Sequence, residues 1–353
     1  MKGMILAAGF GTRFRPATYE IPKPMIPLCN RPLAGWALEA MLVAGIREIV
    51  VNLHHLGDEL EAFLRERYGA ECDFFFSREE EILGTGGGIR RVRAQLDGER
   101  PFVLANGDTV QIPPFRALVD ACEEHRALAA LLLRPPPAND RFTKVFFEEG
   151  RVTGFGEGSG EALMFAGAHA ISPAIFEALP DREFSGITED VYAPAAARGT
   201  PPLAGVLHEG PWFDIGTPAR YVEATGAVLA MMVAGTLDLP DGSSIGHDAS
   251  IVDGKATIDG ELASSVAGAG ARVARGASVR SSVLWEGASI ASGARVTGAV
   301  IGRDVSIPAG AVVEGALVCR RLPGIEYPEG TILAGEFAAA EIRPGSGRLE
   351  NLD

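Results

Sequence analysis

Short apolar runs alternate with amphipathic segments along the first 235 residues of the chain. The apolar runs predict buried strands at residues 5–8, 49–53, 74–76 and 101–105. The amphipathic segments predict helices at 33–44 and 58–68, and another after the glycine-rich turn at 84–88. Strands that alternate with helices predict an α/β domain with a mostly parallel sheet covered on both faces. Ligands of such domains bind at the carboxyl ends of the strands, so the polar residues there are the first candidates for a site.

The pattern of apolar residues changes beyond about residue 237, where the sequence contains an internal repeat. Three consecutive blocks of 17 residues begin at Gly270, Gly287 and Asp304. Such a repeat predicts a parallel β-helix with three short strands per coil, similar to the left-handed hexapeptide-repeat helix. One side of each coil is a residue short of the ideal six. The apolar anchors keep one register through the three blocks: Val273, Ile290 and Ile307; Val279, Val296 and Val313; Leu284, Ile301 and Val318.

These rhythms divide the chain into an α/β domain at 1–235, a β-helix domain at 236–340 and a C-terminal tail at 341–353. The acidic, glycine-containing tail is expected to be frayed or loosely packed. A β-helix of a few coils leaves an exposed end coil and flat faces, which are natural contact surfaces. We therefore expect a homo-oligomer that weakens when the residues after about 240 are removed.

Composition narrows the possible partners. A net charge of −14 argues against nucleic acid, which needs a broad basic surface, but it leaves room for a small phosphorylated ligand. The four cysteines are far apart and form no C-x-x-C pattern, as expected of a reduced, cytoplasmic chain. No apolar run is long enough to predict a membrane span or a signal peptide.

The candidate chemistry begins where the first strand ends, in the segment LAAGFGTRFRP at residues 6–16, followed by Pro-Lys-Pro at 22–24. Closely spaced glycines let backbone N–H groups approach a polyphosphate. Arg13 and Lys23 supply cations for the phosphates and for the charge that develops on leaving pyrophosphate. Taken alone, the segment favours the polyphosphate reading, with a tight surface turn that carries solvated cations as the alternative.

The longer run LAAGFGTRFRPATYEIPKP closely resembles the signature of the sugar-phosphate nucleotidyltransferase family. The resemblance continues through ILGTGGGI at 82–89, ANGD at 105–108 and WFDIGTP at 212–218. It implies a Rossmann-like nucleotidyltransferase domain followed by a left-handed parallel β-helix, which many members of the family carry. It also implies that Arg13 and Lys23 are the catalytic cations that contact the triphosphate and the sugar phosphate.

The resemblance implies binding residues as well. The nucleotide would be bound by Leu6, Ala7, Ala8, Gly9, Gly11, Thr12, Glu79, Gly84 and Thr85. The sugar would be bound by Asn106, Gly154, Glu157 and Gly167. One carboxylate of the run at 79–81 could accept the N1–H and N2–H₂ of guanine, although the run is also typical of a solvated surface.

The resemblance assigns Asp108 and Asp214 to a catalytic Mg²⁺. Their chemistry supports this, because carboxylates at strand ends are suitable ligands for an Mg²⁺ that also bridges phosphates. The alternative is that Asp108 forms a turn and that Asp214 caps the helix beginning near residue 218.

One segment departs from the family pattern. Many relatives carry a Glu-Lys-Pro segment midway, whose lysine meets the sugar phosphate, whereas residues 154–160 contain no lysine here. Glu157 is expected to keep a role at the sugar hydroxyls, and the backbone near Gly167 is the candidate sugar contact.

These features together predict transfer of a nucleotidyl group from an NTP to a sugar 1-phosphate, with GTP and mannose 1-phosphate, or a related manno-configured sugar, as the favoured pair. A UTP-dependent N-acetylmuramate-1-phosphate uridylyltransferase is the alternative within the enzymes. The alternative outside them is a non-catalytic regulatory subunit that binds an NDP-sugar.

Overall fold

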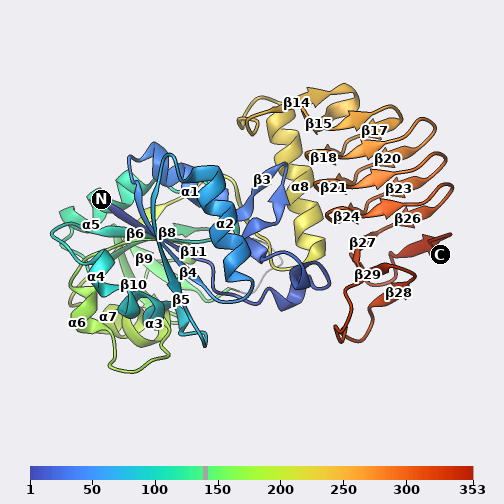
Figure 1. The fold of residues 1–353 in the computed structure, drawn as a ribbon. Helices are drawn as coiled ribbons and strands as arrows, with labels where there is room; N and C mark the ends of the chain where they lie inside the picture. The colour runs from blue at the N-terminus through green and yellow to red at the C-terminus, as the bar shows by residue number, and fades with distance from the viewer. Residues whose placement is uncertain (138–141, 353) are drawn as a thin grey trace. The chain divides into compact units, whose positions relative to one another are not determined.

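The computed structural model describes residues 1–137 and 142–352, and their contacts divide the chain into two compact units. The first unit comprises Met1–Phe10 and Leu33–Phe213, and the second comprises Gly11–Pro32 and Asp214–Asp353 (Figure 1). The segment Gly11–Pro32 thus belongs to the same compact unit as the C-terminal part of the chain. Within the described ranges, no helix is both long and apolar enough to cross a membrane.

A nine-stranded sheet forms the centre of the first unit. Its first four strands are parallel: β5 (Asp73–Arg78), β4 (Glu48–Leu53), β1 (Lys2–Leu6) and β6 (Phe102–Asn106). The order continues with β11 (Glu161–Ile171), β8 (Ala129–Arg134), β12 (Leu203–Leu207), β10 (Arg151–Phe155) and β9 (Val145–Glu148). Because β11 runs antiparallel to both β6 and β8, the sheet is mixed.

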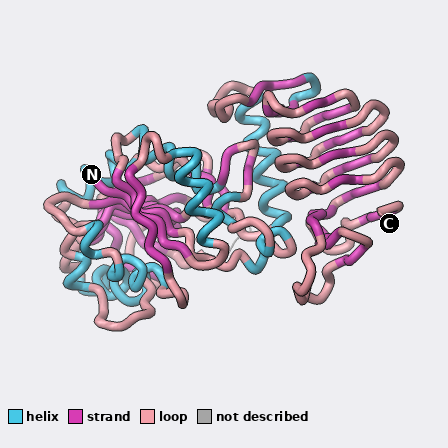
Figure 2. The backbone as a smooth tube through the Cα atoms, viewed as in Figure 1, coloured by secondary structure: helices cyan, strands magenta, loops and turns pink. Residues whose placement is uncertain are grey.

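The expected α/β fold is confirmed, and the expectation of a mostly parallel sheet holds for its first half. The second half differs because β9, β10 and β11 follow one another through short turns, which join antiparallel strands, whereas a parallel pair needs a long crossover. Helices and strands of this unit are distinguished in Figure 2. The helices are α1 (Leu33–Val43), α2 (Gly57–Tyr68), α3 (Gly84–Arg91), α4 (Arg93–Leu96), α5 (Phe115–Glu124), α6 (Ile175–Ala178) and α7 (Ala193–Arg198).

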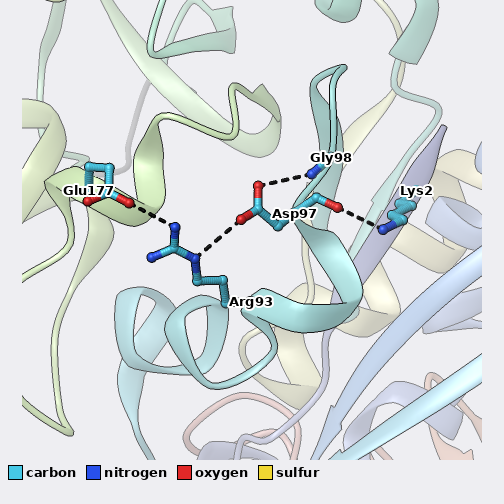
Figure 3. Close-up of polar contacts among 5 residues, drawn as sticks. All are labelled: Lys2, Arg93, Asp97, Gly98 and Glu177. Atoms are coloured by element: carbon cyan, nitrogen blue, oxygen red, sulfur yellow. Dashed lines mark hydrogen bonds and ion pairs between the residues drawn. The ribbon is translucent and has the colours of Figure 1, made fainter.

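A cluster of charged groups ties the end of α4 to its neighbours (Figure 3). Arg93 donates hydrogen bonds to Asp97 at 3.2 Å and to Glu177 of α6 at 2.8 Å. Lys2, at the start of β1, donates to the backbone carbonyl of Asp97 at 2.9 Å. Exposed ion pairs add little stability, so this cluster mainly fixes the direction in which the chain leaves α4.

The second unit is built on a β-helix whose coils repeat every 17 residues. One side is a sheet of β14 (Ser243–Gly246), β15 (Ser250–Asp253), β18 (Val266–Ala267), β21 (Val283–Leu284), β24 (Val300–Ile301), β27 (Ala316–Arg320), β29 (Phe337–Glu341) and β28 (Ile332–Ala334). The second side contains β16 (Thr257–Ile258), β19 (Arg272–Val273), β22 (Ser289–Ile290) and β25 (Ser306–Ile307). The third contains β17 (Glu261–Ala263), β20 (Ser278–Arg280), β23 (Arg295–Thr297), β26 (Val312–Glu314) and β30 (Arg348–Glu350).

The predicted register of the coils is confirmed. Val273 pairs with Ile290, and Ile290 pairs with Ile307 on the next coil. The other two columns of apolar anchors pair in the same way, along β20, β23 and β26 and along β21, β24 and β27. These side chains fill the interior of the helix, where nearly all of them are inaccessible to solvent.

The short side of the coil turns through a left-handed residue. Ser264, Ser281, Gly298 and Gly315 occupy equivalent positions, with φ between 48° and 58°. The serine that follows each of the first two turns is buried, and its hydroxyl accepts a backbone N–H from the next coil. This column of side-chain hydrogen bonds replaces the ladder bond that the missing residue would have made.

The expectation of a loosely packed tail is wrong. The strand β30 pairs antiparallel with β26, and Leu352 is buried. On the neighbouring side, β29 pairs antiparallel with β27. The physical reason is that the last coil would otherwise present open strand edges and an apolar interior to water. Since this end is covered, the predicted self-association would have to use the flat faces of the β-helix.

A buried histidine in the first unit connects β11 to the turn Thr188–Tyr192. His169 Nδ1 lies 2.8 Å from the hydroxyl of Tyr192, and Nε2 is buried without a hydrogen-bond partner among the described residues. Burial lowers the pKa of His169 to about 3, so the imidazole is neutral in the folded protein at ordinary pH.

This histidine should make the first unit sensitive to acid. In the unfolded chain, His169 has its ordinary pKa of about 6.5 and binds a proton below that pH. In the folded chain, the same imidazole binds a proton only when the pH falls to about 3. His169 should therefore lower the free energy of unfolding by about 2 kcal/mol between pH 7.5 and 5.0. His169→Gln should flatten this dependence in urea titrations, whereas His125→Gln, at a less buried site, should retain it. An unchanged slope in His169→Gln would show that other groups cause the loss.

Candidate active site

The carboxyl ends of the parallel strands in the first unit meet at one edge of the sheet. In the register of β1 with its neighbours, Leu6 pairs with Asn52 at the end of β4 and with Asn106 at the end of β6. Ala7 follows directly in the chain, and Glu79 follows the end of β5. This edge therefore collects several of the residues that the sequence assigned to nucleotide and sugar.

A chain of buried hydrogen bonds links three of these strand ends. The backbone N–H of Ala7 donates to Asn52 Oδ1 at 2.7 Å, and Asn52 Nδ2 donates to Glu79 Oε1 at 2.8 Å. The other carboxylate oxygen, Oε2, accepts the backbone N–H of Leu83 at 3.0 Å. Both side chains are only 5% exposed, so the bonds are shielded from water.

Glu79 therefore differs from the other two acids of its run. Glu80 and Glu81 are exposed, as expected of a solvated surface, whereas Glu79 holds the residue before the glycine-rich turn. Its assignment to the guanine base stays a prediction, and the structure adds a positioning role for its carboxylate. Asn52 escaped the sequence analysis, although a polar residue among the apolar residues of β4 was a signal for it.

Close backbone packing accounts for the glycines at the start of α3. The N–H groups of Gly86 and Gly87 both donate to the carbonyl of Ser185, and Ser185 returns a hydrogen bond to Leu83. A Cβ atom on Gly87 would lie 2.1 Å from the carbonyl oxygen of Glu183. Gly84 and Thr85, assigned to the nucleotide, thus start a helix that is fixed against residues 183–185.

Two of the predicted sugar-binding residues lie together. Gly167 adopts a φ of 83° at an irregularity in β11, and a Cβ atom there would lie 2.6 Å from Asn106 Nδ2. Trp212 adds a half-buried ring beside them, since its Nε1 donates to the carbonyl of Ala166 at 2.9 Å. The sequence analysis did not assign Trp212, although an aromatic residue two positions before a candidate metal ligand pointed to it.

Gly154 and Glu157 lie elsewhere on the sheet. Gly154 belongs to β10, and the exposed Glu157 sits in the turn that leads into β11. Residues 161–163, which follow this turn, pair with β9, whereas residues 168–171 of β11 pair with β6, the strand that ends at Asn106. The sugar contacts assigned to Gly154 and Glu157 stay predictions.

In the second unit, the signature segment folds into a compact loop. Thr18 Oγ1 donates to the carbonyl of Gly11 at 2.9 Å, which closes the loop on itself. Lys23 begins a short 3₁₀ turn and is only 8% exposed, with its Cβ near Gly11. Phe14 is buried against the ring of Tyr221, with a centroid separation of 5.5 Å.

Two further charged residues assigned to the reaction, Arg13 and Asp214, lie close together in this unit. A Cβ atom on Gly216 would lie 2.9 Å from Arg13 Nη1 and 3.2 Å from Asp214 Oδ2, so both side chains flank this glycine. Asp214 also accepts a hydrogen bond from Arg220 Nη1 at 2.6 Å. Arg220 was missed by the sequence analysis, because its position in a helix gave no sign that it faces back to the strand.

The alternative reading of Asp214 as a helix cap is wrong. The helix α8 (Pro218–Val233) is capped by Thr217, whose Oγ1 accepts the N–H of Arg220 at 3.3 Å. The carboxylate of Asp214 is therefore not used at the helix terminus. It ends β13 (Trp212–Asp214), which pairs with β7 (Thr109–Gln111), the strand that follows Asp108.

The donor set suits a hard divalent cation. Asp108 and Asp214 offer carboxylate oxygens, which Mg²⁺ prefers, and Mg²⁺ usually takes one or two carboxylates together with substrate phosphates. No group of three or more His, Cys, Asp or Glu side chains suited to a metal exists in the described part of the chain. The assignment of Asp108 and Asp214 to a metal stays a prediction.

Comparison with known proteins agrees with this chemistry. Residues 2–230 match the family described as Nucleotidyl transferase. The chain belongs to the nucleotidyl transferase family. Residues 236–316 of this nucleotidyl transferase match a second family, described as GlmU-like, C-terminal hexapeptide, in accord with the left-handed β-helix.

Curated relatives give a narrower comparison. This nucleotidyl transferase is 29% identical over 234 residues to the mannose-1-phosphate guanylyltransferase catalytic subunit beta of Danio rerio, a match that covers 63% of each chain. It is also 29% identical over 248 residues to the UTP–glucose-1-phosphate uridylyltransferase of Synechocystis sp., covering 65% of this chain and 64% of the relative. The chain thus spans less than two thirds of the length of these relatives.

Solved structures resemble the fold. HddC from Yersinia pseudotuberculosis, in a crystal structure complexed with GMP-PN, superposes with a TM-score of 0.54 at 21% identity. The match covers 64% of this nucleotidyl transferase and 99% of that chain. At this identity the likeness concerns the fold alone.

The hydrogen-bonded chain through Glu79 should be essential to the stability of the first unit. Glu79→Ala leaves Asn52 Nδ2 and the N–H of Leu83 buried without their acceptor, and should cost about 2 to 4 kcal/mol in urea unfolding. Glu80→Ala is the matched control and should change stability by less than about 0.5 kcal/mol, because Glu80 is exposed. Equal effects of the two substitutions would contradict the positioning role.

Proposed function

We propose that the chain is a magnesium-dependent sugar-1-phosphate nucleotidyltransferase that makes an NDP-sugar and pyrophosphate. The observation that carries the proposal lies in the second unit, where Arg13 and Asp214 flank Gly216 and Lys23 packs close to Gly11. Two cations and one carboxylate are thus held in the segments that carry the family signature. GTP and mannose 1-phosphate, or a related manno-configured sugar, are the proposed substrates.

The chemistry follows from the charges of the reactants. A phosphate oxygen of the sugar 1-phosphate attacks the α-phosphorus of the NTP, and the bond from that phosphorus to the bridging oxygen breaks to release pyrophosphate. The second pKa of a phosphate monoester is about 6, so the nucleophile is already largely a dianion at neutral pH and needs no general base. The work left to the protein is to hold two anions in line and to offset charge in the transition state.

The residues divide this work between them. Arg13 and Lys23 neutralise phosphate oxygens, and a guanidinium can make two parallel hydrogen bonds to one phosphate. Backbone N–H groups of residues 6–12 approach the triphosphate. A Mg²⁺ held by Asp108 and Asp214 would neutralise the phosphates further and favour the in-line geometry. Arg220 orients the carboxylate of Asp214 through their hydrogen bond.

The choice of GTP rests on the relatives and on the β-helix. The Danio rerio relative is named a mannose-1-phosphate guanylyltransferase subunit, and the Synechocystis relative is named a uridylyltransferase. The second candidate is therefore a UTP-dependent activity, including transfer to N-acetylmuramate 1-phosphate. Among readings outside catalysis, a regulatory NDP-sugar-binding subunit is disfavoured, because such subunits tend to lose the cations or acids that this chain retains.

The first experiment measures pyrophosphate release with Mg²⁺ over four NTPs and a panel of sugar 1-phosphates. The panel contains mannose, glucose, N-acetylglucosamine, N-acetylmuramate and heptose. We expect the strongest signal with GTP and mannose 1-phosphate. A signal only with UTP and N-acetylmuramate 1-phosphate would support the second candidate. Tight NDP-sugar binding by folded protein with no turnover in any combination would support the regulatory reading.

Substitutions test the assigned cations in the active combination. Arg13→Ala and Lys23→Ala should each lower kcat by about 10² to 10³, because each removes one preorganised cation from the transition state. Lys255→Ala, which removes an exposed lysine of the β-helix unit, is the control for loss of positive charge and should leave kcat within about twofold. A loss confined to KM would contradict a role for Arg13 or Lys23 in the transition state.

A further inference from the structure

The loop that carries Arg13 and Lys23 also contains two residues that face the C-terminal end of the β-helix. Tyr19 and Glu20 lie in and after a 3₁₀ turn at Ala17–Tyr19, between the two cations in the sequence. Their partners belong to residues 320–327, which begin at the last residue of β27 and continue beyond it. All of these residues lie within the second unit.

The first contact is an ion pair between Glu20 and Arg320. Arg320 Nε donates to Glu20 Oε1 at 2.9 Å, and a terminal nitrogen of the same guanidinium donates to the same oxygen. The side chain of Glu20 is only 12% exposed, so its carboxylate is largely shielded from competing water. The hydrogen bond to Glu20 raises the pKa of Arg320.

The second contact is aromatic. The rings of Tyr19 and Tyr327 meet edge to face, with centroids 5.4 Å apart. The hydroxyl of Tyr19 donates to the carbonyl of Glu326 at 3.1 Å, and the hydroxyl of Tyr327 accepts the N–H of Leu322 at 2.7 Å. Tyr327 is thus fixed by its own segment and offers a rigid surface to the loop. We call Arg320, Glu326 and Tyr327 the brace.

The other end of the loop is held separately. The hydroxyl of Tyr221 donates to the carbonyl of Pro27, and Trp285 Nε1 donates to the oxygen of the same hydroxyl at 3.0 Å. Asn30 donates to the carbonyl of Ala267 at 3.1 Å. These bonds fix residues 27–30, whereas the brace meets residues 19 and 20, close to Lys23.

The brace begins at the end of the last coil. Arg320 is the final residue of β27 and of the third 17-residue block, and it follows residues 236–316, which match the hexapeptide family. Its backbone pairs with Phe337 of β29 where the end of the β-helix is closed, and this pairing does not use its side chain. The side chain of Arg320 instead leaves the β-helix and meets the loop.

We propose that Arg320 is a positioning residue for the reaction, which acts through Glu20 to hold Arg13 and Lys23 in place. The inference rests on the proposed function, because it assigns those two cations to the phosphates. A loop without such support would have to be ordered by its ligand, and that ordering would weaken binding. Misplacement of a catalytic group by about 1 Å can lower the rate by about 10².

The test uses full-length protein and inorganic pyrophosphate, the product shared by every candidate nucleotide. Arg320→Glu should weaken pyrophosphate binding about tenfold and lower kcat more than it raises KM. It should also speed hydrogen exchange of the backbone amides in residues 11–26. The matched control is Arg321→Glu, the same charge change at the neighbouring exposed arginine, whose backbone N–H bonds to Glu336. It should leave all three readouts within about twofold of wild type.

Charge reversal separates positioning from a general structural effect. Glu20→Arg combined with Arg320→Glu should restore most of the lost binding and exchange protection. If Arg320→Glu fails to fold, Arg320→Gln serves as the milder variant and should change the readouts in the same direction. Unchanged exchange in residues 11–26, equal losses in Arg320→Glu and Arg321→Glu, or no recovery on reversal would each overturn the proposal.

The outcome is distinguishable from failure of the proposed function. Were no sugar 1-phosphate turned over by wild-type protein, the binding and exchange readouts would still decide whether the brace positions the loop. Faster exchange with unchanged pyrophosphate binding and unchanged kcat would overturn the positioning role of Arg320 and leave the proposed function intact.

Discussion

A carboxylate that leaves water has to be met by hydrogen-bond donors, and this requirement organises the edge of the first sheet. Glu79 is met by the amide of Asn52 on one side and by the backbone N–H of Leu83 on the other. Asn52 in turn receives the N–H of Ala7, the first residue after β1. The start of the signature and the entry to the glycine-rich turn thus depend on one buried group. Neither loop can move without leaving a buried polar atom unsatisfied, and such atoms are costly.

In the second unit, the loop that carries Arg13 and Lys23 is held by elements far away in the sequence. Its β-helix is regular because left-handed residues recur at each corner of the 17-residue coil. Its interior is a column of small and branched apolar side chains, which pack against one another from coil to coil. A rigid support of this kind can orient long charged side chains, which lose much conformational freedom when they are fixed.

The sequence predicted those parts of the molecule whose cause is local or periodic. The columns of Val273, Leu284 and Val279 were readable because the repeat fixes their spacing, and the signature was readable because its residues are contiguous. Contacts between residues that are far apart in the sequence could not be predicted in this way. Arg220 and the strand β30 have no local pattern that indicates their contacts, and the polar Asn52 within an apolar strand gave no indication of its partners. The antiparallel pairing of β9 with β10 and β11 was missed for the same reason, since hairpins and crossovers can follow from similar apolar runs.

The number of coils has a consequence of its own. Each coil advances the β-helix by the spacing between neighbouring strands, about 4.8 Å. Asn30 contacts the backbone of an early coil at Ala267, and Glu20 contacts Arg320 at the end of the last one. One short loop therefore spans the height of the stack, and its two ends are matched to the distance between those coils. The number of coils therefore sets the distance between the two contacts of the loop. A coil inserted or deleted between Ala267 and Arg320 would change that distance by one strand spacing, even though the coils themselves would still stack.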